Sequence, residues 1–545
     1  MNNRKTIMNK YKFEIFLFIS VFILVFAVYF HCSDFGFINL DDNALIQNKV
    51  QEMESISSAK NLIFTSVFDG IRDKFYRPVL TLTFLADTLV CGGDPGFYHY
   101  SNVLWHMLAV FLVFAFFRSM GYTKTVSYGA AVVFAVHPAL SSAVAWVPGR
   151  NDILLAVFSM ISFIFFIRAV KNNGISDILI SVFCMAAALF TKETAVVLPF
   201  IYILYMILYG IKTDKKNIAR IFFCFAFALL LYAAFRYFVL SGGVKSITVP
   251  EMILNAATSL KALFWYFGVV LLTEKILIYP QINNLPFIST LLPVMLTAGL
   301  CVLLRKHCNF RHILFGILWF VLFMIPTFVM PEKDFYTHRL YLPILGCFIV
   351  IFEIIKALNA RYAVNKKIFF VIFAVLIAAM SVMSYKQTFL YKDRAAFWLH
   401  AIKENPHSSQ INAAISGYYA DTGDFVKAEE HALAALKYAK NINIPGALTQ
   451  LAEVYYRKND MEKAAQYFSK AIETGKYRES GYLGLSKVYE SEGKKEDAMK
   501  VLSDAYEILP QSRIIKKRLD NLKQGKKEIS YVISLNGGSW AVGQL

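Results

Sequence analysis

Residues 15–30 read IFLFISVFILVFAVYF, and residues 36–43, which follow closely, read GFINLDDN. The core of a bilayer is crossed by about 20 consecutive apolar residues, so we expect the first stretch to lie within a membrane-spanning helix. The adjacent carboxylates Asp41 and Asp42 then stand just outside the membrane. We expect the rest of the chain to be organised around this acidic pair.

Composition points to a membrane protein with a soluble appendage. The chain has 545 residues, of which 57% are hydrophobic, and its mean hydropathy is +0.48. A soluble protein of this size needs a more polar surface, so that class is excluded. The net charge of +18 does not indicate a nucleic-acid partner, because the basic residues gather in short loops between apolar runs. The 7 cysteines show no CxxC pair, so neither a zinc site nor a disulfide framework is indicated.

The lengths of the apolar runs and the charged residues that separate them predict about eleven membrane spans. They cover residues 11–31, 100–118, 125–146, 152–169, 175–190, 194–211, 218–240, 287–304, 311–330, 338–357 and 366–386. Basic loops place the N-terminus in the cytoplasm, and an odd number of spans places the C-terminal region on the extracytoplasmic side. Two less apolar runs, 79–90 and 260–272, are predicted to lie in the outer interface of the membrane. A true span over 260–278 would reverse this topology.

A repeat begins near Ser408, where the composition becomes polar and helical. Gly423, Asn459 and Gly493 recur with offsets of 36 and 34 residues, and each is followed five residues later by an alanine. This spacing resembles that of tetratricopeptide (TPR) repeats, in which each helix pair buries a face against the next pair. We therefore predict an α-solenoid of about three repeats.

The acidic pair is the first candidate for chemistry. A carboxylate within hydrogen-bond reach can take a proton from an attacking hydroxyl group. The second carboxylate can orient the first or raise its proton affinity. The alternative is that Asp41 and Asp42 form an Asx-turn or cap a helix, because aspartate favours both places.

Several basic and polar residues fall on the same side of the membrane in this topology. Arg77 follows Tyr76, Arg150 and Asp152 lie in the segment that begins at His137, Lys192 precedes Glu193, and Arg339 follows His338. Arginine and lysine at these places suit a phosphate group. The alternatives are interfacial anchors, snorkelling side chains and local ion pairs such as Arg150 with Asp152 or Lys192 with Glu193. Together with the acidic pair, these residues suit a lipid-linked substrate that carries a phosphate.

The order of these motifs carries a resemblance to a known family. One span, the acidic pair, Tyr76-Arg77-Pro78, His137-Pro138, Gly149-Arg150-Asn151-Asp152, Lys192-Glu193, Arg339-Leu340-Tyr341 and terminal TPRs follow one another along the chain. This order resembles the TPR-bearing membrane O-mannosyltransferases and, more broadly, glycosyltransferases of the GT-C fold. The resemblance implies an all-α protein. The expected domains are a polytopic, GT-C-like helical bundle at 1–390, a TPR domain at 408–512 and a basic, glycine-containing tail at 513–545.

The resemblance also implies a reaction. A sugar, such as mannose, would pass with inversion from a polyprenyl phosphate to a hydroxyl group of a protein or glycan. Asp41, or else Asp42, would be the general base. Arg77, Arg150, Lys192 and Arg339 would contact the donor phosphate, and Tyr76, His137, Asp152, Glu193 and His338 would be further site candidates. Ser142 and His338 stand where relatives often carry glutamate, which leaves the acceptor and any divalent metal ion open; no metal-ligating residue is assigned.

Two other functions fit parts of the pattern. A transporter of lipid-linked glycans also places charges in the membrane, although such proteins often show internal repeats between their halves, which this sequence lacks. A membrane-anchored TPR scaffold would bind a protein partner, but it would not need charges at the ends of several spans. The short basic loops and compact outer region favour a bacterial inner membrane, with the repeats in the periplasm, over an endoplasmic-reticulum membrane.

Overall fold

The protein is helical wherever its structure is described. The computed structural model describes the backbone of residues 2–68, 75–240, 248–271, 276–282, 284–330, 334–363, 365–440, 443–475, 479–510 and 512–524. Within these ranges no strand forms, and a single isolated bridge pairs Gln281 with Asp334. The prediction of an all-α protein is therefore confirmed.

The chain divides into two compact units. The first unit comprises residues 1–36, 77–236 and 247–392, and the second comprises 37–76, 237–246 and 393–545. The second unit therefore combines the acidic segment with the repeats, whereas the sequence assigns residues 37–76 to the membrane domain. The predicted boundaries at 390, 408 and 512 stay a prediction.

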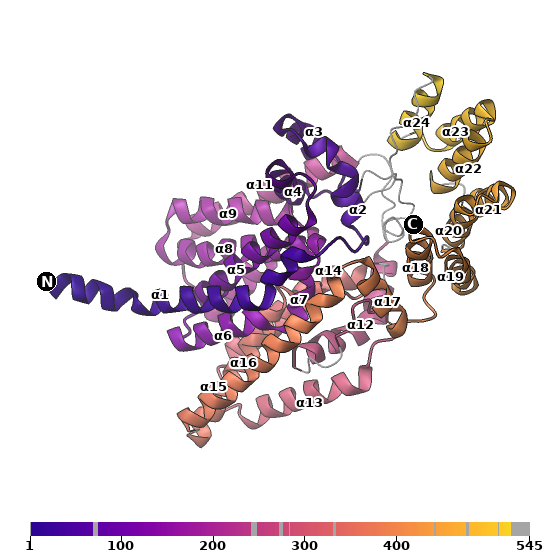
Figure 1. Ribbon diagram of the computed structural model, residues 1–545. Coiled ribbons are helices and arrows are strands. Elements are labelled where there is room, and N and C mark those ends of the chain that lie inside the picture. The colour runs from indigo at the N-terminus through magenta and orange to yellow at the C-terminus, as the bar shows by residue number, and fades with distance from the viewer. Residues whose placement is uncertain are drawn as a thin grey trace. The chain divides into compact units, whose positions relative to one another are not determined.

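The first unit consists of helices of very different lengths (Figure 1). In chain order they are α1 (Asn2–Tyr29), α4 (Pro78–Cys91), α5 (Pro95–Ser119), α6 (Lys124–Val136), α7 (Ser141–Ala145), α8 (Arg150–Asn172), α9 (Ile175–Leu189), α10 (Leu198–Tyr209), α11 (Lys215–Leu240), α12 (Val249–Leu271), α13 (Phe287–Leu303), α14 (Phe310–Val329), α15 (Ile344–Tyr362) and α16 (Lys366–Thr388).

Seven of the described helices are long and apolar enough to cross a membrane, and α6 with the bent segment Pro138–Ala145 makes an eighth candidate. The chain is thus an integral membrane protein, but the predicted number of about eleven spans is not confirmed. The predicted spans at 175–190, 194–211 and 287–304 coincide with shorter apolar helices. Helix α12 has 23 residues and qualifies as a span, in contrast to the interfacial helix expected at 260–272.

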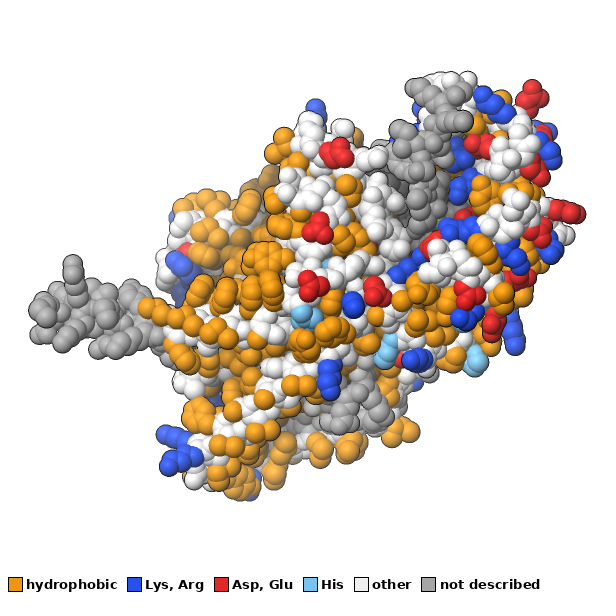
Figure 2. Space-filling model, in the orientation of Figure 1, with side chains coloured by type: hydrophobic (Ala, Val, Ile, Leu, Met, Phe, Trp, Pro, Cys, Tyr) orange, Lys and Arg blue, Asp and Glu red, His pale blue; other side chains and the backbone are white. Residues whose placement is uncertain are grey.

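The surface of the first unit is suited to lipid. Along α16, Ile368, Phe370, Val371, Ile372 and Val375 are each more than half exposed. Figure 2 shows hydrophobic side chains over much of the visible face of this unit, whereas charged side chains gather on the repeats. Apolar residues exposed at this density avoid water only when hydrocarbon covers them.

The repeats confirm the predicted TPR-like solenoid. Its helices are α18 (Ser409–Asp421), α19 (Phe425–Tyr438), α20 (Ile444–Arg457), α21 (Met461–Thr474), α22 (Glu479–Ser491), α23 (Lys495–Ile508) and α24 (Arg513–Lys523). The three recurring alanines, Ala428, Ala464 and Ala498, are fully buried. Gly423, Asn459 and Gly493 have φ values of 82°, 63° and 77°, which explains the recurrence of glycine or asparagine at this turn.

The predicted tail at 513–545 begins in a helix. Leu519 and Leu522 of α24 are buried against α22 and α23, as is Ile515. The glycine-containing residues 525–545 lie outside the described residues.

Two chain segments of the second unit are joined by a hydrogen bond. The acidic segment forms the short helices α2 (Asp42–Leu45) and α3 (Ala59–Ile63), and the indole Nε1 of Trp398 donates to the carbonyl of Ile38 at 3.1 Å. Trp398 lies on α17 (Arg394–Glu404), which leads into the repeats. Where these segments leave the first unit, the amide of Gly36 donates to the carbonyl of Lys392 at 2.8 Å.

Candidate active site

A broken helical segment places Asp152 in the first unit. Helix α6 ends at Val136, and the chain bends by 55° into the segment Pro138–Ala145. The second proline, Pro148, lies in the short 3-10 helix Val147–Gly149 that precedes α8. A Cβ atom on Gly149 would come within 2.7 Å of the carbonyl oxygen of Ala143, so only glycine fits there. This close turn sets the first turn of α8, which carries Arg150, Asn151 and Asp152.

Asp152 is the centre of one polar cluster. The Nζ atom of Lys192 lies 2.7 Å from each carboxylate oxygen of Asp152, and 3.4 Å from Oδ1 of Asn151. The Nε2 atom of His338 lies 3.9 Å from Oδ2 of Asp152, and its ring lies 5.0 Å from that of Trp146. The structure therefore brings together Asp152, Lys192 and His338, three of the residues singled out from the sequence.

Glu193 is the centre of a second, neighbouring cluster. Its Oε2 atom accepts hydrogen bonds from Arg77 Nε at 3.2 Å and from Arg77 NH2 at 2.9 Å. Its Oε1 atom lies 3.4 Å from NH1 of Arg236. Glu193 thus links Arg77, at the start of α4, with Arg236 near the end of α11. Such paired guanidinium groups keep a fixed orientation, which favours recognition of an anion.

The two clusters bring several basic side chains together. Arg77 and Arg236 pair with Glu193, Lys192 pairs with Asp152, and Arg339 lies near enough to Lys192 to influence its pKa. Burial lowers the pKa of Lys192; Asp152 opposes this shift, and Arg77 and Arg339 add to it. Burial also lowers the pKa of His338 well below 6.5, and Lys192, Arg339 and Arg77 lower it further, so His338 is neutral at pH 7. An added anion would relieve this repulsion among the basic groups.

Arg339 lies in the 3-10 helix Thr337–Leu340 and is half-buried. Its guanidinium carbon lies 6.0 Å from the centre of the Tyr336 ring. Within the part of the chain that the structure describes, it forms no ion pair with a carboxylate. Its charge is therefore less compensated than that of Arg77 or Lys192.

Acidification is expected to weaken the link between Glu193 and its two arginines. Burial tends to raise the pKa of Glu193, but Arg77 and then Arg236 lower it to below the ordinary value of 4.5. The stabilisation is therefore complete above pH 4.5 and is lost as the pH falls through the lower folded-state pKa. Thermal unfolding of wild type and Glu193→Gln should differ at neutral pH, and this difference should shrink on acidification.

The matched control for this measurement is Glu54→Gln, because Glu54 is exposed and lies outside both clusters. Its effect on unfolding should be small at every pH. A difference between wild type and Glu193→Gln that stays constant below pH 4.5 would contradict the assigned pairing.

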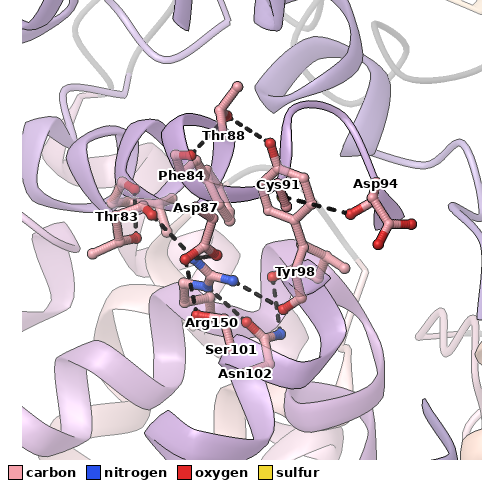
Figure 3. A network of polar contacts seen from close by, with 12 residues as sticks. Thr83, Phe84, Asp87, Thr88, Cys91, Asp94, Tyr98, Ser101, Asn102 and Arg150 are labelled. Carbon is pink, nitrogen blue, oxygen red and sulfur yellow. Dashed lines mark hydrogen bonds and ion pairs between the residues drawn. The ribbon is translucent and has the colours of Figure 1, made fainter. Parts of the chain in front are cut away.

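Arg150 belongs to a separate, fully buried network (Figure 3). Its NH1 atom lies 2.6 Å from Oδ2 of Asp87, its Nε atom donates to Oδ1 of Asn102 at 2.6 Å, and NH2 donates to the carbonyl of Tyr98 at 3.0 Å. The face of the Phe84 ring lies 4.7 Å from the guanidinium carbon. The alternative interpretation, a pair of Arg150 with Asp152, is not seen, since Arg150 pairs with Asp87 and Asp152 with Lys192.

The acidic pair lies in the second unit, and its two members differ. Asp42 is 1% exposed, and its Oδ2 atom accepts a hydrogen bond from the amide of Leu40 at 3.3 Å. Asp41 is half-buried at the N-terminus of α2, and its side chain makes no capping hydrogen bond there. The local-turn interpretation therefore fits Asp42 better than Asp41.

Two other predicted site residues are placed differently. Tyr76 is buried and belongs to the second unit. His137 is buried in the first unit, where its Nε2 atom lies 3.0 Å from the carbonyl oxygen of Val270 and its Nδ1 atom accepts from the amide of Ala139. These bonds connect the bend after α6 to the end of α12.

Sequence reasoning missed Arg236 and Asp87, and it assigned no role to Asn102. Arg236 follows a long apolar run and reads as an ordinary flanking charge. Asp87 is the only acidic residue in the apolar run 78–91, which was an available signal, because a lone charge among apolar residues usually has a buried partner. Among the described residues, no group of three or more His, Cys, Asp or Glu side chains is arranged to hold a metal ion.

Comparisons with known proteins agree with both parts of the chain. Residues 98–238 match the family described as "Dolichyl-phosphate-mannose-protein mannosyltransferase", and residues 445–474 match a tetratricopeptide repeat. The former range contains Arg150, Asp152, Lys192, Glu193 and Arg236.

Individual relatives carry the same description. Protein O-mannosyl-transferase TMTC1 of Homo sapiens is 22% identical over 463 residues, which cover 71% of this chain and 52% of that protein. Tmtc1 of Drosophila melanogaster is 29% identical over 178 residues, covering 32% of this chain and 20% of that protein. TMTC3 of Mus musculus is 31% identical over 192 residues, covering 34% and 20%.

The chain spans about half, or less, of the length of these curated relatives. The crystal structure of yeast Tom70 aligns with 78% of this chain at 12% identity, but a TM-score of 0.22 carries no argument about the fold. In its membrane helices and in its repeats, the chain resembles the TPR-containing protein O-mannosyltransferases.

Proposed function

We propose that the protein is an inverting glycosyltransferase that moves mannose from a polyprenyl phosphate to a hydroxyl group of a polypeptide. The family description and the names of the relatives support a mannosyltransferase that acts on protein. The observation that carries the proposal is the cationic group Arg77, Lys192, Arg236 and Arg339, in which Glu193 pairs with Arg77 and Arg236 and Asp152 pairs with Lys192. A phosphate is one of the anions that arginine and lysine side chains recognise well.

The cationic cluster would stabilise the leaving group. As the bond between the sugar and the phosphate oxygen breaks, negative charge develops on the lipid phosphate. Lys192 and Arg77 are fixed before reaction by Asp152 and Glu193, so they stabilise this charge without having to reorganise, and Arg339 adds a less compensated charge. A phosphate that leaves as an anion needs no general acid to protonate it. We do not assign phosphate contact to Arg150, because its guanidinium is buried among Asp87, Asn102 and Tyr98.

Asp41 would act on the acceptor. The hydroxyl oxygen forms a bond to the anomeric carbon from the face opposite the phosphate, while its proton passes to Asp41. A single displacement inverts the anomeric centre and forms no covalent enzyme intermediate, so a second carboxylate at retaining distance is not required. The reaction thus needs a base for the acceptor hydroxyl and cationic groups for the leaving phosphate.

The direction of the chain in the membrane is part of the proposal. Basic loops favour a cytoplasmic N-terminus, which supports an extracytoplasmic acidic segment after α1, and the hydrogen bond from Trp398 to Ile38 supports the same side for the start of the repeats. There the repeats would hold the acceptor polypeptide or a protein partner. A bacterial inner membrane fits the compact outer region.

A transfer assay tests the proposal directly. Purified protein in vesicles should transfer labelled mannose from a polyprenyl phosphate-mannose donor to a serine- and threonine-containing polypeptide. The same assay with polyprenyl phosphate-linked glucose or galactose would establish sugar specificity. No transfer from any of these donors would contradict the proposal.

Two outcomes separate the alternatives. If labelled lipid crosses the vesicle without transfer, the cationic cluster would belong to a transport path. If neither transfer nor movement occurs but the repeats retain a binding partner, the protein would be a membrane-anchored scaffold.

A further inference from the structure

The turn between α7 and α8 is held by the side-chain amide of one residue on α5. The Nδ2 atom of Asn102 lies 3.2–3.3 Å from the carbonyl oxygens of Val144, Trp146 and Val147. These carbonyls lie at the break between two helices, where the amide of Asn102 adds to the backbone hydrogen bond that the Trp146 carbonyl accepts from Gly149. Asn102 is fully buried, so water does not compete for them.

Arg150 fixes the orientation of that amide. The guanidinium Nε donates to Oδ1 of Asn102 at 2.6 Å, so the amide nitrogen necessarily points away, toward the three carbonyls. Arg150 is itself fixed by Asp87 and by the carbonyl of Tyr98, as Figure 3 shows. A buried guanidinium with fewer partners would be strongly destabilising, so each contact constrains the others.

This turn positions two parts of the candidate site, the ring of Trp146 and the first residues of α8. Trp146 lies against His338, with 5.0 Å between ring centres, and α8 begins directly after the turn with Arg150, Asn151 and Asp152. The pair of Asp152 with Lys192 therefore depends on where this turn places the start of α8. A misplacement of about 1 Å at a reacting centre can cost about 100-fold in rate.

We propose that Asn102 and Arg150 are positioning residues: Arg150 aims the amide of Asn102 at the turn 144–147, and the turn sets Trp146 against His338 and Asp152 against Lys192. This inference rests on the proposed function for its effect on catalysis. It gives Arg150 a role at the site without contact with the donor.

The sharpest variant is Asn102→Asp. It has the same shape and keeps an oxygen for Arg150, but its second oxygen replaces the amide donor and faces three carbonyl oxygens. Repulsion should then displace the turn. The matched control is Asn217→Asp, because Asn217 is also buried and its Nδ2 atom donates to the carbonyl of Ala169 at 3.0 Å, near the opposite end of α8.

The first measurement does not require transfer activity. The contribution of Trp146 to fluorescence is obtained by comparing each protein with its Trp146→Phe derivative. Asn102→Asp should shift the Trp146 emission maximum, and Asn217→Asp should leave it unchanged, although both lower the melting temperature. An unchanged Trp146 emission in Asn102→Asp would overturn the inference, even if no version of the protein transfers mannose.

The second measurement compares the effects of each variant on kcat and on KM. Asn102→Asp should lower kcat by about 100-fold with little change in the KM for the acceptor, because contacts with the acceptor are intact while the site is misplaced. Asn217→Asp should retain kcat. Equal losses in both variants would assign Asn102 a purely structural role and would overturn the inference.

If Asn102→Asp does not fold, Arg150→Lys replaces it as the test. This variant keeps the charge opposite Asp87 but lacks the forked contact with Asn102 and Tyr98. It should give the same shift in Trp146 emission and the same loss in kcat.

Discussion

Asp41→Asn is expected to reduce mannose transfer by about 100- to 10,000-fold, the contribution that a general base typically makes. Asparagine preserves the size of the side chain but cannot take the proton of the acceptor hydroxyl. Because aspartate and asparagine have nearly the same shape, the variant should fold like wild type. The measurement is the initial rate of transfer in vesicles, with the melting temperature as a check on folding.

Two further variants complete this test. Glu52→Gln removes an exposed carboxylate of the same segment and should leave transfer unchanged. Asp42→Asn retains an oxygen for the amide of Leu40 and should lower stability more than rate. Full activity of Asp41→Asn together with loss in Asp42→Asn would transfer the role of base to Asp42.

Arg339→Gln is the second substitution with a large expected effect. Removal of one preorganised group that stabilises developing charge typically costs about 100- to 1,000-fold in kcat. Arg339 is the informative choice because its removal separates no ion pair among the described residues, whereas removal of Lys192 would leave Asp152 buried without its main partner. A loss of activity in Arg339→Gln would therefore reflect the missing charge.

The control for Arg339 is Arg361→Gln, near the end of α15. Arg361 is exposed, and its NH1 atom donates to the carbonyl of Leu303 at 3.3 Å. It should retain full transfer. Arg339→Gln should also bind a polyprenyl phosphate without sugar more weakly than wild type does. Equal kinetics in the two arginine variants would exclude Arg339 from the donor phosphate.

Local patterns predicted the repeats well because each repeat is specified by its own few residues. A small residue that packs against a neighbouring helix, as at Ala464, and a residue with positive φ at the turn, as at Asn459, can be recognised without knowledge of distant contacts. The register of all three repeats followed from these positions. The sequence also located helices at every predicted span, since long apolar runs favour helices in a membrane.

The number of spans was harder to predict because hydropathy does not reveal where an apolar helix bends or how long it is. The break at Pro138 divides one predicted span, and α9 and α10 are too short to qualify. Helix α12 was underestimated because only its second half is strongly apolar. Partners within the site were harder still. Nothing local shows that Arg150 pairs with Asp87 instead of Asp152, because that choice depends on how α4, α5 and α8 pack.

The hydrogen bond from Trp398 to Ile38 makes the acidic segment and the start of the repeats parts of one body. In the proposed reaction, this body carries the base Asp41 and the repeats that recruit the acceptor, and the first unit carries the basic residues that bind the donor phosphate. The two specificities could then evolve separately. A change in the repeats would alter which polypeptides are bound and leave the sugar specificity unchanged. A change in the donor-binding residues would alter the lipid carrier and leave the bound polypeptides unchanged.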